Sequence, residues 1–465
     1  MTASVDRRRR FTAVGAILGA LGIVTLIVVS AIAVTTLRTS QEGKAPPVDQ
    51  REVVVFPETP NGVIGVVDDF DRLTSIAVLT LDPSGTGGSV VVVPVNVDQS
   101  NGFGEMRLPV SRQPYAPGND EQAAELISEL EPLLTLTIQQ AFVAGPDELG
   151  VLLEPLSPFD VELSESIVDS DTPGSGIVVP RGNRMLDTAT MVAALTAIDA
   201  TDSSYAHHGS DVELWSAIAN GEPTDVEAPL DDTGRPLPPQ SFDELWGRLF
   251  TGDVGVRDLD IDESAARSAD NVDDADFVIA DRPDALLVFG GISPALVTTP
   301  NESLTVSLVV RFDPDDVAEL GTAADGTQIT KTSMTRRFIG ELLFAKANVV
   351  GVDMATDPDE VPDVTQLMIV SESMEIEARG LTERFFGDAE VVIADRLLDG
   401  VDVVAVLGAD FLDQRAELLE IERAAAEQAE VDDAEADFDL TGGEAEDLRN
   451  TPVPAGTTDT VVEDG

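Results

Sequence analysis

The residues of this chain that could bind a charged group are few, and the most suggestive are four arginines. Arg107 and Arg112 lie in the segment Gly-Phe-Gly-Glu-Met-Arg-Leu-Pro-Val-Ser-Arg, and Arg181 and Arg184 lie just before an apolar run. A guanidinium group donates paired hydrogen bonds to phosphoryl oxygens, so four converging arginines would form a phosphate-binding site. The simpler interpretation is that they are solvated arginines that offset the charge of an acidic surface. We predict no catalytic residue among them.

Thiol and imidazole chemistry have little support in this chain. It has no cysteine, which excludes cysteine-ligated zinc, iron–sulfur clusters, disulfides and thiol nucleophiles. Its two histidines, His207 and His208, are adjacent and have no spaced carboxylate partner, so we expect them on a loop surface. Several acidic clusters lack the spacing of a calcium-binding loop: Asp231-Asp232, Asp258–Glu263 and Asp273–Asp276. We therefore predict neither a metal site nor a bound cofactor.

The charge of the chain restricts its partners. Its 465 residues include 86 Asp and Glu against 28 Lys and Arg, which gives a formal net charge of −58. Such a field repels phosphate backbones, so the composition argues against nucleic-acid binding. The hydrophobic content of 43% allows two or three domains, each with its own core. The preference for arginine over lysine is typical of a GC-rich bacterial genome, although a salt-adapted proteome has a similar acidic excess.

The N-terminal segment predicts a membrane anchor. Four consecutive cations, Arg7–Arg10, precede the uncharged and mostly apolar segment 11–37. About 20 apolar residues span a bilayer as a helix, and flanking positive charge marks the cytoplasmic side. We therefore expect a cytoplasmic tail at 1–10, a transmembrane helix at 11–37 in contact with the lipid bilayer, and an extracytoplasmic remainder at the cell membrane. A cleaved signal peptide ending near Ala31-Ile32-Ala33 is the alternative, and a buried core helix is a weaker one.

The segment after the anchor predicts an α/β protein. Residues 38–50 form a polar, proline-containing linker, after which short β-branched runs alternate with helical patterns. We expect strands at Ser75–Leu81 and Ser89–Val95, joined by a turn at Asp82–Gly88. We expect helices at Glu121–Glu131, ending at Pro132, at Met185–Ile198 and at Phe242–Phe250. The segment 134–142 is ambiguous between strand and helix, and 201–276 is otherwise polar.

The last third of the chain predicts a small α/β domain followed by an acidic tail. Strands are expected at Leu304–Phe312, Val349–Val352, Gln366–Val370, Glu390–Ile393 and Val401–Leu407. Helices are expected at Ser333–Phe344, with Ser333 as the N-cap, and at Ser371–Phe386. The tail, 413–465, holds 17 acidic residues against three arginines. We expect a helix over 412–429 and disorder beyond it.

The strand Leu73–Leu81 with its turn Asp82-Pro83 resembles the opening of the LytR-CpsA-Psr (LCP) family of bacterial cell-envelope proteins. The following strand, Ser89–Pro94, is similar to the family strand that runs into a Pro-Arg-Asp motif. Here that motif reads Pro94-Val95-Asn96, without the arginine and the aspartate. Leu186–Met191 resembles the start of a family helix, without its glycine and without the arginines that follow it.

The C-terminal part resembles the LytR C-terminal domain, and this match is more specific than the match of the N-terminal part to the LCP family. The segments 335–353 and 366–386 follow its pattern, as does the closing string Val-Leu-Gly-Ala-Asp-Phe at 406–411. The opening Asn-Gly turn of that domain is replaced by Arg311-Phe312-Asp313-Pro314. The resemblance thus implies a divergent LCP-like mixed-sheet domain at 51–300 and a LytR C-terminal-like domain at 301–412.

The family transfers a glycopolymer phosphate from a polyprenyl pyrophosphate carrier to peptidoglycan. That reaction needs arginine forks and usually a divalent cation to stabilise phosphoryl charge. Since the matched positions lack these arginines, we predict a degenerate, non-catalytic member with a binding or scaffolding role in cell-wall assembly. Its expected partners are cell-wall polymer, polyprenyl phosphate lipid or envelope proteins.

Two alternatives remain open. The first is an active phosphotransferase that uses Mg²⁺ together with Arg107, Arg112, Arg181 and Arg184. The second is an unrelated surface interaction module that uses the acidic tail as its partner-binding arm.

Overall fold

The computed structural model describes residues 51–97, 110–170, 176–198, 208–260, 278–301 and 303–447, with side chains omitted at 112 and 430–447. The chain divides into two compact units, Met1–Glu52 and Val53–Gly465. The expected transmembrane segment, 11–37, and the linker, 38–50, lie outside the described residues. Within the described residues no helix is long and apolar enough to cross a membrane.

Alternate residues of the central strands are buried on opposite faces of a first, five-stranded sheet. Val63 and Val78 join one hydrophobic cluster, whereas their neighbours Ile64 and Leu79 join another. A period of two with both faces apolar is the pattern of a sheet covered on both sides. The strand order is β10 (Val254–Asp258), β4 (Gly88–Val93), β3 (Leu73–Leu81), β2 (Asn61–Val67) and β5 (Ala141–Ala144). β10–β4 and β2–β5 are parallel and the other pairs antiparallel, so the expected mixed sheet is confirmed.

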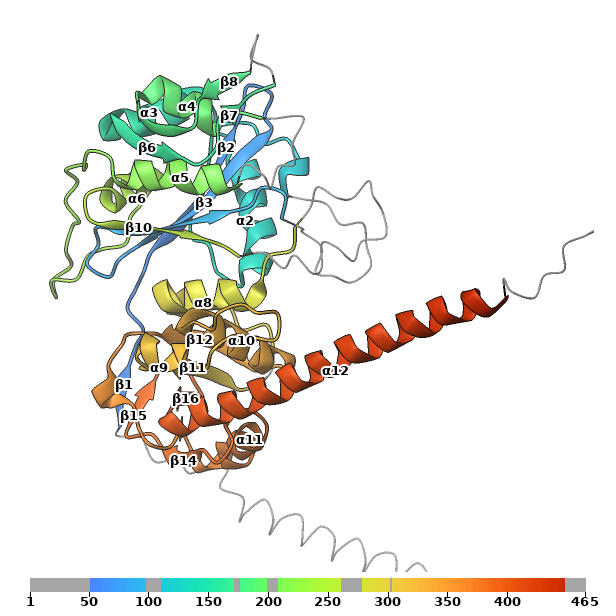
Figure 1. Ribbon diagram of the computed structural model, residues 1–465. Helices are drawn as coiled ribbons and strands as arrows, with labels where there is room; N and C mark the ends of the chain where they lie inside the picture. Colours follow the sequence, from blue (N-terminus) through green and yellow to red (C-terminus); the bar gives the residue numbers. More distant parts are fainter. Residues whose placement is uncertain are drawn as a thin grey trace, which may run out of the picture. The chain divides into compact units, whose positions relative to one another are not determined.

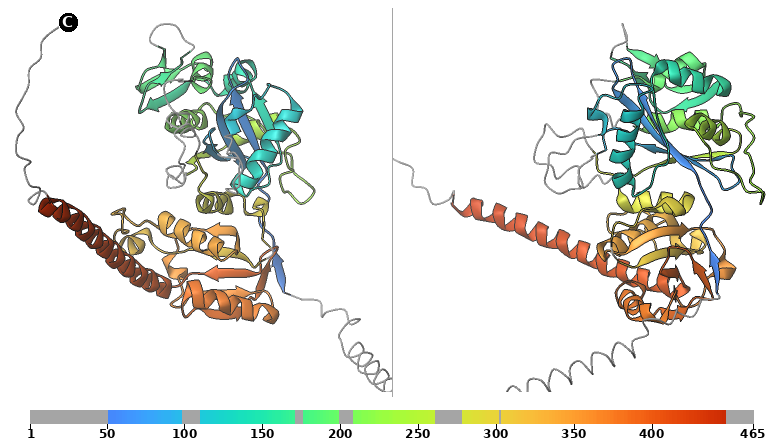
Figure 2. Two further views of the ribbon diagram at one scale, coloured as in Figure 1. Left: turned by 90° about the vertical axis from the view of Figure 1, so that its right-hand side faces the viewer. Right: turned by 180° about the vertical axis from the view of Figure 1, so that it is seen from behind.

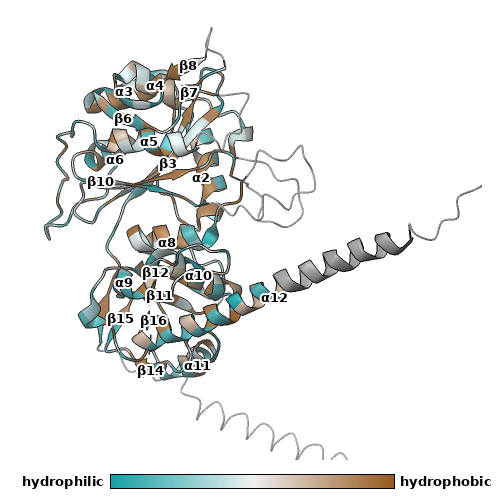
Figure 3. Ribbon diagram, in the orientation of Figure 1, coloured by the Kyte–Doolittle hydropathy of each residue, from teal (hydrophilic) through white to brown (hydrophobic). Residues whose placement is uncertain are grey.

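Helices pack on both faces of this sheet (Figures 1 and 2), and Figure 3 shows β3 as a largely hydrophobic ribbon. One face is covered by α2 (Asp120–Leu134), whose Leu126, Leu130 and Leu134 are buried in the first cluster. The other face is covered by α3 (Pro146–Leu153), α4 (Thr188–Leu195), α5 (His208–Ala219) and α6 (Phe242–Leu249). Two short antiparallel pairs lie apart from the sheet: β6 (Phe159–Leu163) with β9 (Gly182–Leu186), and β7 (Ile167–Val168) with β8 (Ile177–Val179).

The turn between β3 and β4 depends on glycine. Gly88 has φ 144°, and a Cβ atom placed there would lie 2.0 Å from the carbonyl oxygen of Thr80. Only a residue without a side chain allows that approach. The expected turn over 82–88 is therefore confirmed.

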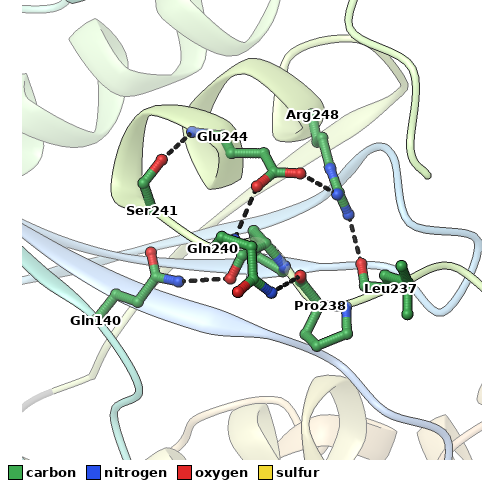
Figure 4. A network of polar contacts seen from close by, with 8 residues as sticks. Gln140, Leu237, Pro238, Gln240, Ser241, Glu244 and Arg248 are labelled. Carbon is green, nitrogen blue, oxygen red and sulfur yellow. Dashed lines mark hydrogen bonds and ion pairs between the residues drawn. The ribbon is translucent and has the colours of Figure 1, made fainter.

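A buried arginine fixes the polar segment that precedes α6 (Figure 4). Arg248 is 1% exposed, donates to the carbonyl of Leu237 at 2.7 Å, and pairs with Glu244 one turn earlier. Glu244 accepts the backbone N–H of Gln240, which lowers the pKa of its carboxyl together with the Arg248 contact. Gln140 of the segment before β5 donates to the carbonyl of Pro239. These contacts hold an otherwise irregular stretch against the sheet.

A second five-stranded sheet forms the C-terminal part. Its order is β12 (Asn348–Asp353), β11 (Thr305–Val309), β16 (Val403–Val406), β13 (Gln366–Ile369) and β14 (Glu390–Ile393). Its helices are α8 (Arg282–Ile292), α9 (Pro314–Ala318), α10 (Lys331–Phe344), α11 (Glu375–Leu381) and α12 (Ala409–Asp447). Shorter elements are β1 (Glu52–Val54), β15 (Arg396–Leu398), a π-helix (Thr382–Phe386) and several 3₁₀ turns, which include Val110–Arg112 and Pro294–Leu296. The predicted α/β class is thus confirmed for both sheets.

Several predicted boundaries are wrong, each for a local reason. Met185 and Leu186 are strand residues of β9, because they pair with β6 before the Asp187 side chain caps α4. Pro132 does not end α2, since it stands in the last turn, where its missing N–H removes one helical bond. Thr330, not Ser333, is the N-cap of α10, and the two residues form a reciprocal capping box.

Other differences concern whole elements. The polar region 201–276 contains α5 and β10, which its composition did not reveal. α12 continues beyond the expected end at Ala429 to Asp447. α8 packs against β12 and α10, so by its contacts it belongs with the second sheet, although it lies before the expected boundary at 300.

A buried lysine joins the ends of two parallel strands of the second sheet. The Lys331 ammonium donates to the carbonyls of Phe312 at 2.9 Å and Met354 at 3.0 Å, which follow β11 and β12. Burial lowers the pKa of this lysine. The three donors of the ammonium thus reach two carbonyl oxygens beyond the strand ends and the Thr356 hydroxyl oxygen.

We expect Lys331→Met to lower the free energy of unfolding by at least ~2 kcal/mol, because the variant leaves those carbonyls without donors. Lys346→Met is the matched control, since Lys346 is exposed, and its effect should stay within ~0.5 kcal/mol. Equilibrium denaturation monitored by circular dichroism measures both. Equal stability of the two variants would contradict the structural role given to Lys331.

Candidate functional site

The segments that resemble the family's phosphate-binding motifs meet at one end of the first sheet. Ser75 lies near the start of β3, and Pro94-Val95-Asn96 directly follows β4. The two strands are antiparallel with Ile76 opposite Val93, so these segments are neighbours. The 3₁₀ turn Val110–Arg112 is bound here as well, since the Ser111 N–H donates to the carbonyl of Val95 at 2.9 Å.

The position of the family's arginine holds a core residue. Val95 is 7% exposed and belongs to the hydrophobic cluster that contains α2. Asn96, at the aspartate position, is 1% exposed, and its carbonyl accepts the N–H of Val278. A buried valine leaves no place for a guanidinium group that reaches a phosphate. The valine that replaces the motif's arginine is therefore part of the hydrophobic core.

Helix α5 covers this end of the sheet with polar side chains. The Trp215 indole N–H donates to the Ser75 hydroxyl oxygen at 3.0 Å. The Ser75 hydroxyl in turn hydrogen-bonds the carboxyl of Asp211, which is 9% exposed. Burial raises the pKa of Asp211 well above its usual value, and the hydrogen bond from Ser75 opposes that shift only in part. Asp211 is accordingly a proton-holding group inside the fold.

A histidine and an aspartate pair beside this cluster. His208 Nε2 lies 2.5 Å from Asp258 Oδ1, at the end of β10. The His208 side chain is 6% exposed and that of Asp258 50%. The expectation of a loop-surface histidine is therefore wrong for His208, because α5 buries it against β10. His207 lies outside the described residues.

The cluster has limited chemical capability. An oriented His–Asp pair can hold and move a proton, but a general base must reach the atom it deprotonates, and this imidazole is buried. Ser75 is bonded to a carboxyl and an indole, and no contact of Ser75 with His208 is present in the part of the chain described. Across the described residues no group of three histidine or acidic side chains is placed to hold a metal ion. Of the polar side chains in this arrangement, Asp211 and His208 are buried and Asp258 is half exposed.

The four arginines proposed as phosphate ligands fall in different places. Arg107 lies outside the described residues, and Arg112 is placed by its backbone beside Val95–Val97. Arg181 and Arg184 are exposed at and before β9, on a separate two-stranded sheet. Arg184 Nη1 donates to the carbonyl of its neighbour Asn183. Of the three arginines in the described part of the chain, Arg112 alone is brought, by its main chain, to the end of the sheet that holds Pro94-Val95-Asn96.

The sequence contained one signal for this cluster that we did not use. Asp211 shares a helical stripe with the buried Leu214, Trp215 and Ile218 at spacings of three, four and seven residues. An acid on an apolar stripe indicates a buried carboxyl group.

Comparisons with known proteins assign no family. No protein-family model and no curated protein matches this chain. Similar solved structures include a transcriptional regulator from Enterococcus faecalis, at 15% identity and a TM-score of 0.31, covering 50% of this chain and 84% of that one. They also include TagT from B. subtilis, at 12% identity and a TM-score of 0.29, covering 45% of this chain and 87% of that one, and TagU from B. subtilis, at 12% and 0.26, covering 44% and 92%. Similarity this low carries no argument about function.

We expect Asp211→Asn to gain stability over the natural protein as the pH rises. The raised pKa means that the unfolded state ionises near pH 4 while the folded state keeps its proton, so the natural protein loses stability with increasing pH until Asp211 ionises in the fold. Asparagine does not titrate and still accepts the Ser75 hydrogen bond. Urea unfolding at pH 4.5, 6 and 7.5 measures the difference. Asp232→Asn, at an exposed acid, is the control, and parallel pH profiles for all three proteins would refute the burial argument.

Proposed function

We propose that this protein is a divergent relative of the LCP family that binds an envelope component without transferring a phosphoryl group. The proposal is carried by the identity of the residues at the end of the first sheet where Ser75 and Pro94-Val95-Asn96 lie. Val95 is buried where the family has arginine, and the neighbouring polar groups are Asp211, His208 and Asp258 rather than guanidinium groups.

The electrostatic argument is direct. A pyrophosphate carries several negative charges, and its transfer develops more charge on phosphoryl oxygens. Removal of one donor to such a group typically costs about 10²–10³ in rate. Asp258 is half exposed at this end of the sheet and adds negative charge there. A site of this composition disfavours the transition state that the family stabilises.

A phosphotransferase is the second candidate, and one observation favours it. The Ser111 and Val110 N–H groups bind the carbonyls of Val95 and Val97, which anchors the backbone of Arg112 beside the motif. In this alternative Arg112 replaces the missing arginine, and a Mg²⁺ ion bound with the substrate supplies the remaining positive charge.

Membrane attachment through residues 11–37, with the rest of the chain outside the cytoplasm, is part of the same proposal. It is supported by the uncharged segment behind Arg7–Arg10. Cell-wall polymer, polyprenyl phosphate lipid and envelope proteins are the proposed partners. The alternative of an unrelated interaction module would instead place partner binding on the acidic tail, 413–465.

Ligand-dependent thermal stability separates the two candidates. With full-length protein in detergent, we expect no magnesium-dependent rise in melting temperature when a short-chain polyprenyl pyrophosphate is added, because buried Val95 stands at the position of the family's arginine. We also expect no transfer of a labelled glycopolymer to peptidoglycan. A magnesium-dependent rise of several degrees that Arg112→Gln abolishes and Arg184→Gln preserves would establish the phosphotransferase instead.

We expect the full-length protein to sediment with membranes and to resist extraction by carbonate, and a variant that lacks residues 11–37 to be soluble. Immunoblots of cell fractions measure both. Protease added to intact spheroplasts should cleave the C-terminal tail. Tail protection or soluble full-length protein would overturn the proposed anchoring.

A further inference from the structure

A cavity of about 690 Å³ lies between the end of β10, helix α8 and strand β12. Its volume falls within the range of small-molecule sites. The cavity is distinct from the Ser75–Asp211 cluster, although Asp258, the partner of His208, forms part of its wall.

The apolar part of the wall comes mainly from Phe56 and from α8, which contributes Leu287, Val288 and Ile292. Glycine allows close packing within this wall. A Cβ atom at Gly351 would lie 2.8 Å from the Ser307 hydroxyl oxygen and 3.0 Å from the Phe56 ring. The absence of a side chain at Gly351 thus lets the Phe56 ring pack directly on β12, where it offers apolar surface to an aliphatic chain.

The charged part of the wall has four carboxylates and one guanidinium, that of Arg257. Three of the carboxylates have a basic partner. Asp258 contacts His208, Asp260 pairs with Arg336 of α10, and Asp353 pairs with Arg311 at 2.7 Å.

The fourth carboxylate, Asp284, has no basic side chain bound to it among the residues that the structure describes. It is 6% exposed, and its Oδ2 accepts the Asp260 N–H at 3.0 Å. Burial raises the pKa of Asp284 to about 6, and the nearby carboxylates of Asp260 and Asp281 also raise it. The hydrogen bond from the Asp260 N–H and the charge of Arg336 lower it in part. At neutral pH the cavity thus contains a buried carboxylate whose charge is not neutralised locally.

We infer that this cavity binds a ligand that carries a primary ammonium group on an apolar stem. The ammonium would bind Asp284, and the stem would lie on Phe56 and the apolar residues of α8. A divalent cation fits less well, because no three acidic or histidine side chains of the described residues are placed to ligate one. An anion fits least, because carboxylates outnumber the guanidinium.

Two matched probes test the chemistry with the full-length protein. Nα-acetyl-lysine amide carries the ammonium, and Nα-acetyl-norleucine amide has the same stem without it. By calorimetry or chemical-shift titration at pH 7.5, we expect the lysine derivative to bind with Kd on the order of 1 mM. The norleucine derivative should bind at least about tenfold more weakly. Equal binding of the two would overturn the inference.

Variants locate the binding. Asp284→Asn keeps an acceptor for the Asp260 N–H and should weaken binding of the lysine derivative about tenfold. Asp388→Asn, at an exposed acid outside the cavity wall, is the control and should leave Kd within about twofold of the natural value. Gly291→Leu places a side chain on the cavity wall at a position where the Cβ atom has its nearest neighbour at 3.6 Å, and it should also abolish binding. Binding that survives both cavity variants would show diffuse attraction to an acidic surface and refute the site.

The pH dependence supplies a further readout. Affinity of the natural protein for the lysine derivative should rise between pH 5 and 7.5 as Asp284 ionises, while that of Asp284→Asn stays flat. The same slope in both would contradict the role of Asp284.

Hexylamine identifies the source of the ammonium. Tighter binding of hexylamine than of the lysine derivative assigns the cavity to a free amine, and the reverse order assigns it to a lysine side chain of a peptide.

Discussion

Lys331 donates hydrogen bonds from its ammonium group to carbonyl oxygens that follow two neighbouring strands, and three arginines likewise join separate segments. Arg248 fixes the segment before α6, and Arg336 joins the end of β10 to α10. Arg415 lies over the rings of Phe338 and Phe411, with its guanidinium carbon 4.8 and 4.7 Å from their centroids. In a chain with 86 acidic residues and 28 basic ones, such cations are scarce. Each cation that joins separate segments is one fewer to offset the acidic surface. The fold therefore depends on these few cations more than their number suggests.

The scarcity of cations also affects the buried carboxyl groups. Asp211 and Asp284 are buried without a basic side chain bound to them in the part of the chain described, and burial raises the pKa of both. Their surroundings differ, since Asp211 is closed in by Ser75 and Trp215, whereas Asp284 faces a cavity. The first is therefore suited to hold a proton within the core. The second is suited to accept a cation from outside.

Polar contacts of β10 lie near both carboxyl groups. His208, on the same helix as Asp211, contacts Asp258 at the end of β10. Two residues later the Asp260 N–H donates to Asp284, and the Asp260 side chain pairs with Arg336. β10 thus connects the cluster under α5 to the cavity beside α8. Arg257 of the same strand and Arg336 of α10 are the cations at this strand end among the residues described.

The sequence by itself determined the α/β class and the most apolar strands, because consecutive apolar residues in β3 and β4 allow burial on both faces. It also determined the amphipathic α6 and the absence of arginine at Val95. Only the tertiary structure decided that α5 is a core helix and that His208 is buried, since their partners, Ser75 and Asp258, are distant in the sequence. Likewise, the strand conformation of Met185 follows from pairing with β6. The physical reason is common to these cases: apolar periodicity is a local property, whereas burial of a polar side chain is favourable only when a partner from another segment reaches it.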